Sequence, residues 1–211
     1  MTTRGSAPIS PWNPLAPLVL ASTSTTRRQL LNDAGFAVEC EGSGVDERAL
    51  ESQTNGLPPT ELALALAKAK ALAVAKRRPD RIVIGADQIL SCEGEIFHKP
   101  QGLTDAERQI GRLSGRTHRL HSAVAVADGG VIVEGFVEEA RLTMRELDRG
   151  AIRRYVEAAG AHRVTASVGG YQLEGLGIHL FARIEGDHST ILGLPLLPLL
   201  GRLRARGCLA F

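Results

Sequence analysis

Two short polar segments carry side chains suited to phosphate and water chemistry. The segment Leu20–Arg28 places a run of hydroxyl side chains, followed by two arginines, where an apolar strand is expected to lead into a helix. Free backbone N–H groups, the helix dipole and guanidinium groups all favour a phosphate at such a place. In the segment Ile82–Gln88, Asp87 follows an apolar run and is expected at the carboxyl edge of a sheet. A carboxylate there can bind a divalent cation or take a proton from water.

Both segments also have purely structural interpretations. Ser and Thr side chains commonly cap helices, and arginines near a helix start are commonly solvated. An aspartate after a strand is often a cap or a turn residue. Asp46 and Glu47 offer a second pair of carboxylates, but they fit an exposed acidic turn equally well. Neither segment identifies a function by itself.

Lysine and glycine usage marks two further places. Only four of the 25 Lys and Arg residues are lysines, among them Lys70 and Lys99. A lysine in so arginine-rich a chain can mark a position that needs a compact ammonium group, although chance explains any one of them equally well. The segment Gly169–Gly177 has four glycines in nine residues, which lets the backbone approach a ligand closely. Glu174 within it can accept hydrogen bonds from a nucleobase, and a flexible surface loop is the alternative.

The overall charge and the cysteines limit the function classes. A formal net charge of +2 is too balanced for a protein that mainly coats nucleic acid, so no nucleic-acid partner is expected. Three widely spaced cysteines argue against a disulfide framework and a zinc site. No segment approaches the ~20 apolar residues of a membrane helix, and the N-terminus lacks the pattern of a signal peptide. We therefore expect a cytoplasmic protein with no membrane partner.

Apolar patterning and turn residues predict alternating strands and helices. Four prolines within residues 1–17 predict a flexible N-terminal arm, and residues 18–211 are expected to form a single domain. The fold class is mixed α/β, with a twisted sheet wrapped by helices. The expected strands are 18–21, 36–40, 81–85, 123–127, 131–137 and 178–184. The expected helices run from after Thr26 to Gly35, from Thr60 as N-cap to Arg77 or Arg78, from a capping box at Thr104 to Gly115, from Asp148 as N-cap to Gly160, and up to Arg206.

Taken in chain order, these segments resemble the Maf nucleotide pyrophosphatases over residues 18–205. Eight blocks in the family's order are far more specific than any one of them. The blocks are Leu20–Leu31, Val45–Glu47, Leu66–Ala71, Val83–Asp87, Gly94–Pro100, Leu113–His118, Gly175–Gly177 and Gly193–Leu196.

This resemblance implies an enzyme that hydrolyses a nucleoside triphosphate to a monophosphate and pyrophosphate. It implies a mixed sheet related to that of inosine triphosphate pyrophosphatases, a divalent cation (Mg²⁺ or Mn²⁺) and a homodimer. Carried over by position, Asp87 is the general base and binds the metal together with Glu47. The residues expected to hold the triphosphate are Ser22, Arg27, Lys70 and Lys99.

Three positions bear on the choice of base. Family members that act on dTTP and UTP resemble Gly-Ala-Asp-Thr, whereas Gln88 follows Asp87 here. Gln88 and Glu174 look like the branch that hydrolyses 7-methyl-GTP, although Thr26 departs from the bulky aromatic residue of that branch. We therefore expect a modified or purine nucleotide as substrate. The alternatives are dTTP or UTP, and a low-turnover nucleotide-binding regulator of septum formation.

Overall fold

The computed structural model describes residues 11–13, 16–54 and 56–211, and a mixed seven-stranded sheet lies at its centre. The strand order is β2-β1-β3-β5-β6-β7, and β4 pairs with the end of β3. Strands β1, β2 and β3 are mutually parallel, and all other pairs are antiparallel. This confirms the predicted mixed α/β class. The strands are β1 (Leu18–Leu20), β2 (Val38–Cys40), β3 (Val83–Cys92), β4 (Glu95–Phe97), β5 (Thr117–Asp128), β6 (Val131–Met144) and β7 (Phe181–Glu185).

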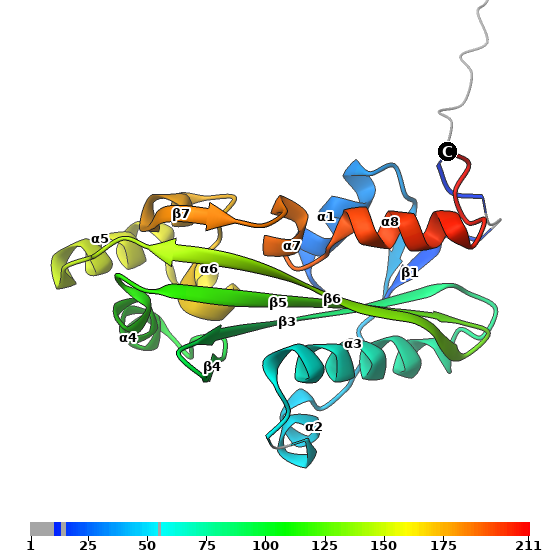
Figure 1. Ribbon diagram of the computed structural model, residues 1–211, viewed down its shortest axis with the longest axis horizontal. Coiled ribbons are helices and arrows are strands. Elements are labelled where there is room, and N and C mark those ends of the chain that lie inside the picture. Colours follow the sequence, from blue (N-terminus) through cyan, green and yellow to red (C-terminus); the bar gives the residue numbers. More distant parts are fainter. Residues whose placement is uncertain (1–10, 14–15, 55) are drawn as a thin grey trace, which may run out of the picture.

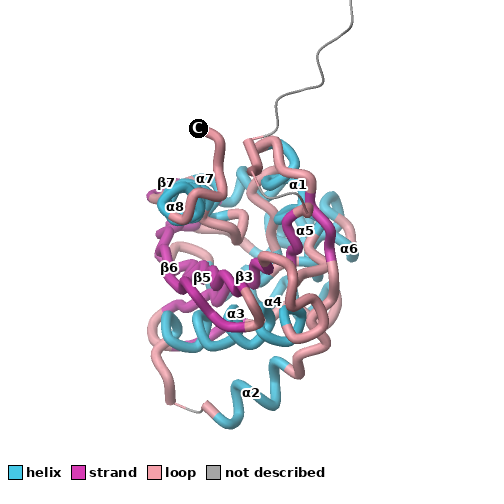
Figure 2. The backbone as a smooth tube through the Cα atoms, turned by 90° about the vertical axis from the view of Figure 1, so that its right-hand side faces the viewer, coloured by secondary structure: helices cyan, strands magenta, loops and turns pink. Residues whose placement is uncertain are grey.

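Helices cover both faces of the sheet. The long helix α3 (Pro59–Ala75) lies against one face, and α2 (Glu47–Gln53) lies beyond it, away from the sheet (Figures 1 and 2). On the opposite face lie α1 (Thr25–Asp33), α7 (His188–Ile191) and α8 (Leu196–Ala205). The remaining helices gather at the end of the sheet near β4 and β7 (Figure 1): α4 (Leu103–Leu113), α5 (Arg149–Ala159), α6 (Ala161–Ala166) and the 3₁₀ turns η1 (Val168–Gly170) and η2 (Leu176–Leu180).

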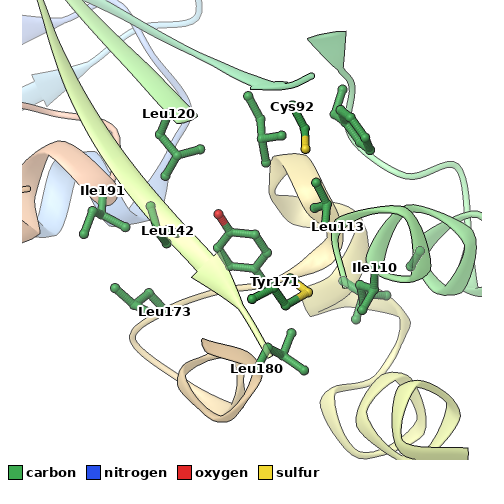
Figure 3. Packing of buried hydrophobic residues seen from close by; sticks show 14 of the residues in the cluster. Cys92, Ile110, Leu113, Leu120, Leu142, Tyr171, Leu173, Leu180 and Ile191 are labelled. Atoms are coloured by element: carbon green, nitrogen blue, oxygen red, sulfur yellow. The ribbon is translucent and has the colours of Figure 1, made fainter. Parts of the chain in front are cut away.

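The buried side chains form one cluster for each of these layers. Alanines and leucines of α3 pack against the face of the sheet that carries Val83 and Ile89. Helices α1 and α8 pack against the opposite face, which carries Ile84 and Ala86. These two residues alternate along β3 with those that face α3. The third cluster lies under α4 and α5 and surrounds Tyr171 (Figure 3). Alternation along β3 therefore sends Gly85 and Asp87 to the α3 face and Gln88 to the other.

Strand β3 is longer than its sequence predicts, and this is the difference that matters most for the site. The predicted strand 81–85 begins at Val83 and continues to Cys92, so Asp87 lies within a strand and not just after one. Polar side chains at 87 and 88 break the apolar run, yet β5 pairs with β3 from Val83 to Ser91 and keeps it extended.

One side of β3 is only partly paired. Parallel β1 pairs with it at Val83 and Ile84, and antiparallel β4 joins it only from Leu90. Within the described residues, no strand pairs with residues 85–89 on that side. Asp87 therefore still lies where β1 ends and its polar loop begins, although β3 itself does not end there.

Several other predicted elements are confirmed, with shifted ends. The turn at 128–130 joins two strands, β5 and β6, which are longer than predicted. Asp148 caps α5 by accepting a hydrogen bond from the amide of Ala151, and Gly160 ends that helix. Helices α1, α3, α4 and α8 and strands β1 and β2 lie where helices and strands were expected. Of the strand predicted over 178–184, the first three residues belong to η2 and the strand spans Phe181–Glu185.

Two predicted helix starts are wrong. Helix α3 begins at Pro59 after Pro58, with no side-chain cap, because a proline at the first position has no N–H to satisfy and its fixed φ suits a helix. Thr60 therefore lies inside the helix. Helix α4 begins after Gly102, which has a φ of 132°, and Thr104 is not its cap.

Part of the predicted N-terminal arm is described. Trp12 is buried against Phe36 with ring centroids 5.7 Å apart, and it pairs with Leu209 near the C-terminus. Residues 1–10, 14 and 15 of that arm lie outside the described residues. In the described part of the chain, no helix combines the length and apolar character needed to cross a membrane.

Candidate active site

A cavity of about 830 Å³ opens along the unpaired side of β3. Its walls come from the β1–α1 loop, residues 42–51, α3, residues 97–99 and the segment around η1. This size lies within the usual range for a small-molecule site. All the side chains that the sequence predicts as site residues line it: Ser22, Thr26, Arg27, Glu47, Lys70, Asp87, Gln88, Lys99 and Glu174.

The chemical centre of the cavity is an ammonium group held between two carboxylates. Lys70 Nζ lies 2.6 Å from Asp87 Oδ1 and 2.8 Å from Glu47 Oε1. Lys70 and Asp87 are buried, whereas the Glu47 side chain is 56% exposed. Taking either charge alone out of water costs several kcal/mol, so each requires the other in this position.

Two local features bring these three groups together. Gly85 has no side chain, and a Cβ there would lie 2.2 Å from the carbonyl oxygen of Ala67 in α3. The helix therefore lies close to β3, and Lys70 reaches Asp87 two residues further along the strand. Asp46 caps α2 by accepting from the amide of Ala49, which places Glu47 in the first turn of that helix. The predicted acidic turn is thus a helix start.

The donor set suits a divalent cation that arrives with phosphates. Within the described residues, no group of three or more His, Cys, Asp or Glu side chains forms a metal site. Glu47 and Asp87 nevertheless each place a carboxylate oxygen against the same ammonium group. Mg²⁺ is commonly bound by one or two carboxylates together with substrate phosphates and waters. These two carboxylates fit that mode and do not form a cage made of protein alone.

The β1–α1 loop is organised by its own hydroxyl groups. Ser22 Oγ accepts a hydrogen bond from the amide of Ser24. Ser24 Oγ caps α1 by accepting from the amide of Arg27. The loop predicted to bind phosphate is therefore a capped helix start that lines the cavity. The capping agrees with the structural interpretation of this segment, and its place in the cavity agrees with the functional one.

Arg27 also ties the framework together. Its Nε donates to the carbonyl of Gly193 at 2.8 Å, and its Nη1 donates to the carbonyl of Ala86 at 3.0 Å, on the unpaired side of β3. Burial lowers the pKa of this guanidinium, and the nearby carboxylates of Asp87 and Glu47 oppose that shift. A guanidinium has five N–H donors, so donors remain for a ligand after these two bonds.

Two further cations that line the cavity form no such bonds among the described residues. Lys99 and Arg48 both line the cavity and are exposed. Among the described residues, neither forms an ion pair. Arg48 was not predicted from the sequence, because one arginine among many carries no local signal. Together they supply positive charge that a phosphate chain can neutralise.

Gln88 also lines the cavity and is anchored through its amide nitrogen. Nε2 contacts Ser122 Oγ at 2.8 Å and the carbonyls of Thr190 and Ile191 at 3.2 and 3.0 Å. These bonds hold α7 against the sheet. They leave the carbonyl oxygen of the Gln88 side chain as the group that can meet a ligand.

Glu174 and Thr26 meet across the cavity. Thr26 Oγ1 donates to Glu174 Oε1 at 3.4 Å, so two predicted specificity residues 148 positions apart are brought together. The segment that carries Glu174 is not a free surface loop, because Tyr171 and Leu173 are buried in the third cluster (Figure 3). The flexible-loop interpretation of Gly169–Gly177 is therefore wrong.

A buried polar pair fixes this segment to the sheet. The hydroxyl of Tyr171 and Nε2 of His118 in β5 are 2.7 Å apart. Burial lowers the pKa of His118 to about 4, so its ring is neutral at pH 7. Tyr171 was not among the site residues predicted from the sequence; its signal there is a lone aromatic residue within a glycine-rich segment.

Sequence comparisons relate this chain to known proteins. The family model described as Maf-like protein matches residues 17–206. A protein of Nitrobacter hamburgensis named nucleoside triphosphate pyrophosphatase is 50% identical, covering 94% of this chain and 98% of that relative. A 7-methyl-GTP pyrophosphatase of Mesorhizobium japonicum is 49% identical, covering 91% of this chain and 97% of that relative.

A solved structure was also found. The nucleoside-triphosphatase, dITP/XTP pyrophosphatase, of Mycobacterium abscessus is 16% identical with a TM-score of 0.40, and the match covers 91% of this chain and 95% of that one. The family assignment rests on the sequence matches, which span nearly the whole chain. By its sequence over residues 17–206, this chain belongs to the Maf-like protein family.

Proposed function

We propose that this protein is a nucleoside triphosphate pyrophosphatase, which hydrolyses its substrate to a monophosphate and pyrophosphate. The observation that carries the proposal is the convergence of Asp87, Lys70 and Glu47 inside one cavity whose rim holds unpaired cations. Relatives about half identical over almost their full length bear that name. A regulator can bind triphosphate without using Asp87 as a base, so the presence of this carboxylate in the cavity favours catalysis.

In the reaction, Asp87 takes a proton from a water molecule whose oxygen attacks the α-phosphorus. The bond from that phosphorus to the α–β bridging oxygen breaks, and this oxygen leaves with pyrophosphate. Positioned general bases contribute ~10²–10⁴-fold to such rates. Negative charge builds on the leaving group, and preorganised cations nearby stabilise it.

The remaining residues hold the phosphates. Arg27, Lys70 and Lys99 neutralise and orient the phosphate chain, and Ser22 lies at the start of the capped loop beside it. A divalent cation, Mg²⁺ or Mn²⁺, bound by Glu47 and Asp87 would neutralise phosphate charge further. The metal and a homodimeric state both stay predictions.

We propose 7-methyl-GTP as the preferred nucleotide. A guanine presents N–H donors at N1 and N2, and Glu174 is a carboxylate acceptor that faces the base end of the cavity beside Thr26. The free carbonyl oxygen of Gln88 adds a second acceptor. Relatives in Mesorhizobium japonicum and Rhizobium johnstonii are named 7-methyl-GTP pyrophosphatases.

The test is pyrophosphate release from 7-methyl-GTP, GTP, dTTP and UTP with Mg²⁺ or Mn²⁺. Release led by 7-methyl-GTP is the expected result. A preference for dTTP or UTP would keep the reaction and overturn the choice of base. Nucleotide binding without release from any of the four would overturn the enzyme and favour a regulatory nucleotide-binding protein.

A further inference from the structure

A second cavity of about 1070 Å³ adjoins the first one. The two cavities are therefore connected where Arg48 and Lys99 lie. The five lining residues that they share are Arg48, Glu51, Phe97, His98 and Lys99. The rest of the second cavity is formed by α4 and the segments before it. The proposed reaction uses none of that part, which includes Glu95, Asp105, Arg108, Gln109 and Arg112.

The second cavity adjoins the part of the first cavity where the phosphates of a bound nucleotide are expected. Gln88, Glu174 and Asp87 line the first cavity and not the second. Lys99 and Arg48, whose charges a phosphate chain can neutralise, line both cavities and form the shared rim. A group attached to the terminal phosphate would therefore pass this rim and enter the second cavity.

The charges of the second cavity are balanced beyond that rim. Arg108 pairs with Asp105, and Arg112 pairs with Glu95. His98 lies 3.6 Å from a carboxylate oxygen of Glu51. A binding site for further phosphates would need unpaired cations, and this part of the cavity has none among the described residues. A polar ligand without net charge fits it better.

Two side chains there suit a nucleobase. The guanidinium carbon of Arg112 lies 4.7 Å from the centre of the Phe97 ring, so its plane is held by stacking on one side. Gln109 is buried, and its Nε2 donates to Asp105. Among the described residues, its Oε1 has no hydrogen-bond partner, and this oxygen is buried. A buried acceptor without a donor is costly, and an N–H group of a ligand would satisfy it once the Gln109 amide turns toward the cavity, which this residue lines.

We propose that the second cavity receives a nucleoside carried on the far end of the phosphate chain, so that the enzyme also cleaves dinucleoside polyphosphates. This inference rests on the proposed function, because the reacting bond is the same. Water attacks the α-phosphorus of the nucleotide in the first cavity, and the bond to the α–β bridging oxygen breaks. That oxygen leaves with the second nucleotide. A dinucleoside triphosphate gives a monophosphate and a diphosphate, and a tetraphosphate gives a monophosphate and a triphosphate.

The test compares diguanosine triphosphate and diguanosine tetraphosphate with GTP and 7-methyl-GTP, using the full chain and Mg²⁺. Chromatography of the products is expected to show GMP with GDP from the triphosphate, and GMP with GTP from the tetraphosphate. Cleavage of the mononucleotides without any cleavage of the dinucleotides would overturn this proposal alone. Cleavage of neither class would overturn the proposed function and this inference together.

A pair of matched variants locates the effect. Arg112→Ala removes the stacked guanidinium from the second cavity. Arg116→Ala removes a comparably exposed arginine that pairs with Glu93 and lines neither cavity. The first variant is expected to lose about tenfold in kcat/KM for diguanosine tetraphosphate, as for loss of one stacking contact, and to stay within about twofold for GTP. Arg116→Ala is expected to change neither, and equal losses in both variants would contradict the assignment.

Discussion

The ammonium group of Lys70 lies 2.6 Å from Oδ1 of Asp87, and both side chains are buried between α3 and β3. This ion pair exists because Gly85 lets the helix lie against the strand. Glu47 approaches the same ammonium group from α2, which lies on the far side of α3 from the sheet (Figure 2). Strand β3, helix α3 and the first turn of α2 thus meet at one charged centre.

Replacing Asp87 by Asn removes the proposed base while keeping the shape of the side chain. Turnover is expected to fall by ~10²-fold or more, the size expected for a general base. Nucleotide affinity is expected to change little, since the cations that hold the phosphates remain. Pyrophosphate release and calorimetric binding measure the two effects. Turnover within a factor of two of the wild type would remove Asp87 from the mechanism.

Gly85→Ala tests the close approach of α3. A Cβ would lie 2.2 Å from a backbone oxygen of Ala67 and 2.6 Å from the backbone nitrogen of Ala71, so the helix must move. We expect a loss of about 1–3 kcal/mol in the free energy of unfolding, typical of overpacking, together with reduced turnover.

Gly201→Ala is the matched control for this change. Gly201 lies within α8, and a Cβ there meets no atom within 4 Å. Alanine in a helix interior is expected to stabilise by about 0.5–1 kcal/mol relative to glycine. Denaturant unfolding compares the two variants. Equal stabilities for Gly85→Ala and the wild type would show that the approach of α3 to β3 is not constrained by Gly85.

Glu174→Gln tests the choice of base. An amide at this position presents donors as well as an acceptor, so the preference for guanine over uracil is expected to fall about tenfold. Thr26→Val is the companion variant, because it removes the hydroxyl that donates to Glu174 and keeps the carboxylate. Ratios of kcat/KM for 7-methyl-GTP and UTP measure the effect. An unchanged ratio in Glu174→Gln would show that this carboxylate does not recognise the base.

Stability is expected to depend on pH through His118. Its pKa is about 4 in the folded protein and near 6.5 when unfolded, so the unfolded chain binds more protons between these values. The contribution of neutral His118 to the free energy of unfolding is therefore fully present above pH 6.5. It is lost as pH falls from 6.5 to 4, by up to about 3 kcal/mol.

His118→Gln isolates this contribution. Gln keeps a polar partner for the hydroxyl of Tyr171 and does not titrate. The difference in unfolding free energy between the two proteins is expected to shrink as pH falls from 6.5 to 4, because contributions from other groups are common to both. A difference that stays constant over this range would contradict the low pKa.

Local sequence patterns predicted most of the elements, and the residues that the family resemblance named all line one cavity. Neither source predicted how these residues are held. Strand β3 was expected to end at Gly85 because Asp87 and Gln88 are polar. Their partners, Lys70 and the carbonyls of Thr190 and Ile191, lie 17 to 103 positions away in the chain, where no local pattern could indicate them.

The wrong helix starts have a related cause. Thr60 follows two prolines that already determine where α3 begins. At α4, the carboxylate of Asp105 accepts from the amide of Gln101, and Gly102 supplies a backbone conformation that favours glycine. The N-cap preference considers one residue at a time. In both helices a neighbouring residue, proline or glycine, sets where the helix begins.

Attack of water at the α-phosphorus is tested most directly by hydrolysis of 7-methyl-GTP in ¹⁸O-labelled water, with mass analysis of both products. Attack at the α-phosphorus by water that Asp87 activates predicts one ¹⁸O atom in the nucleoside monophosphate and none in pyrophosphate. Label in pyrophosphate, or release of inorganic phosphate with a labelled oxygen, would contradict the proposed reaction.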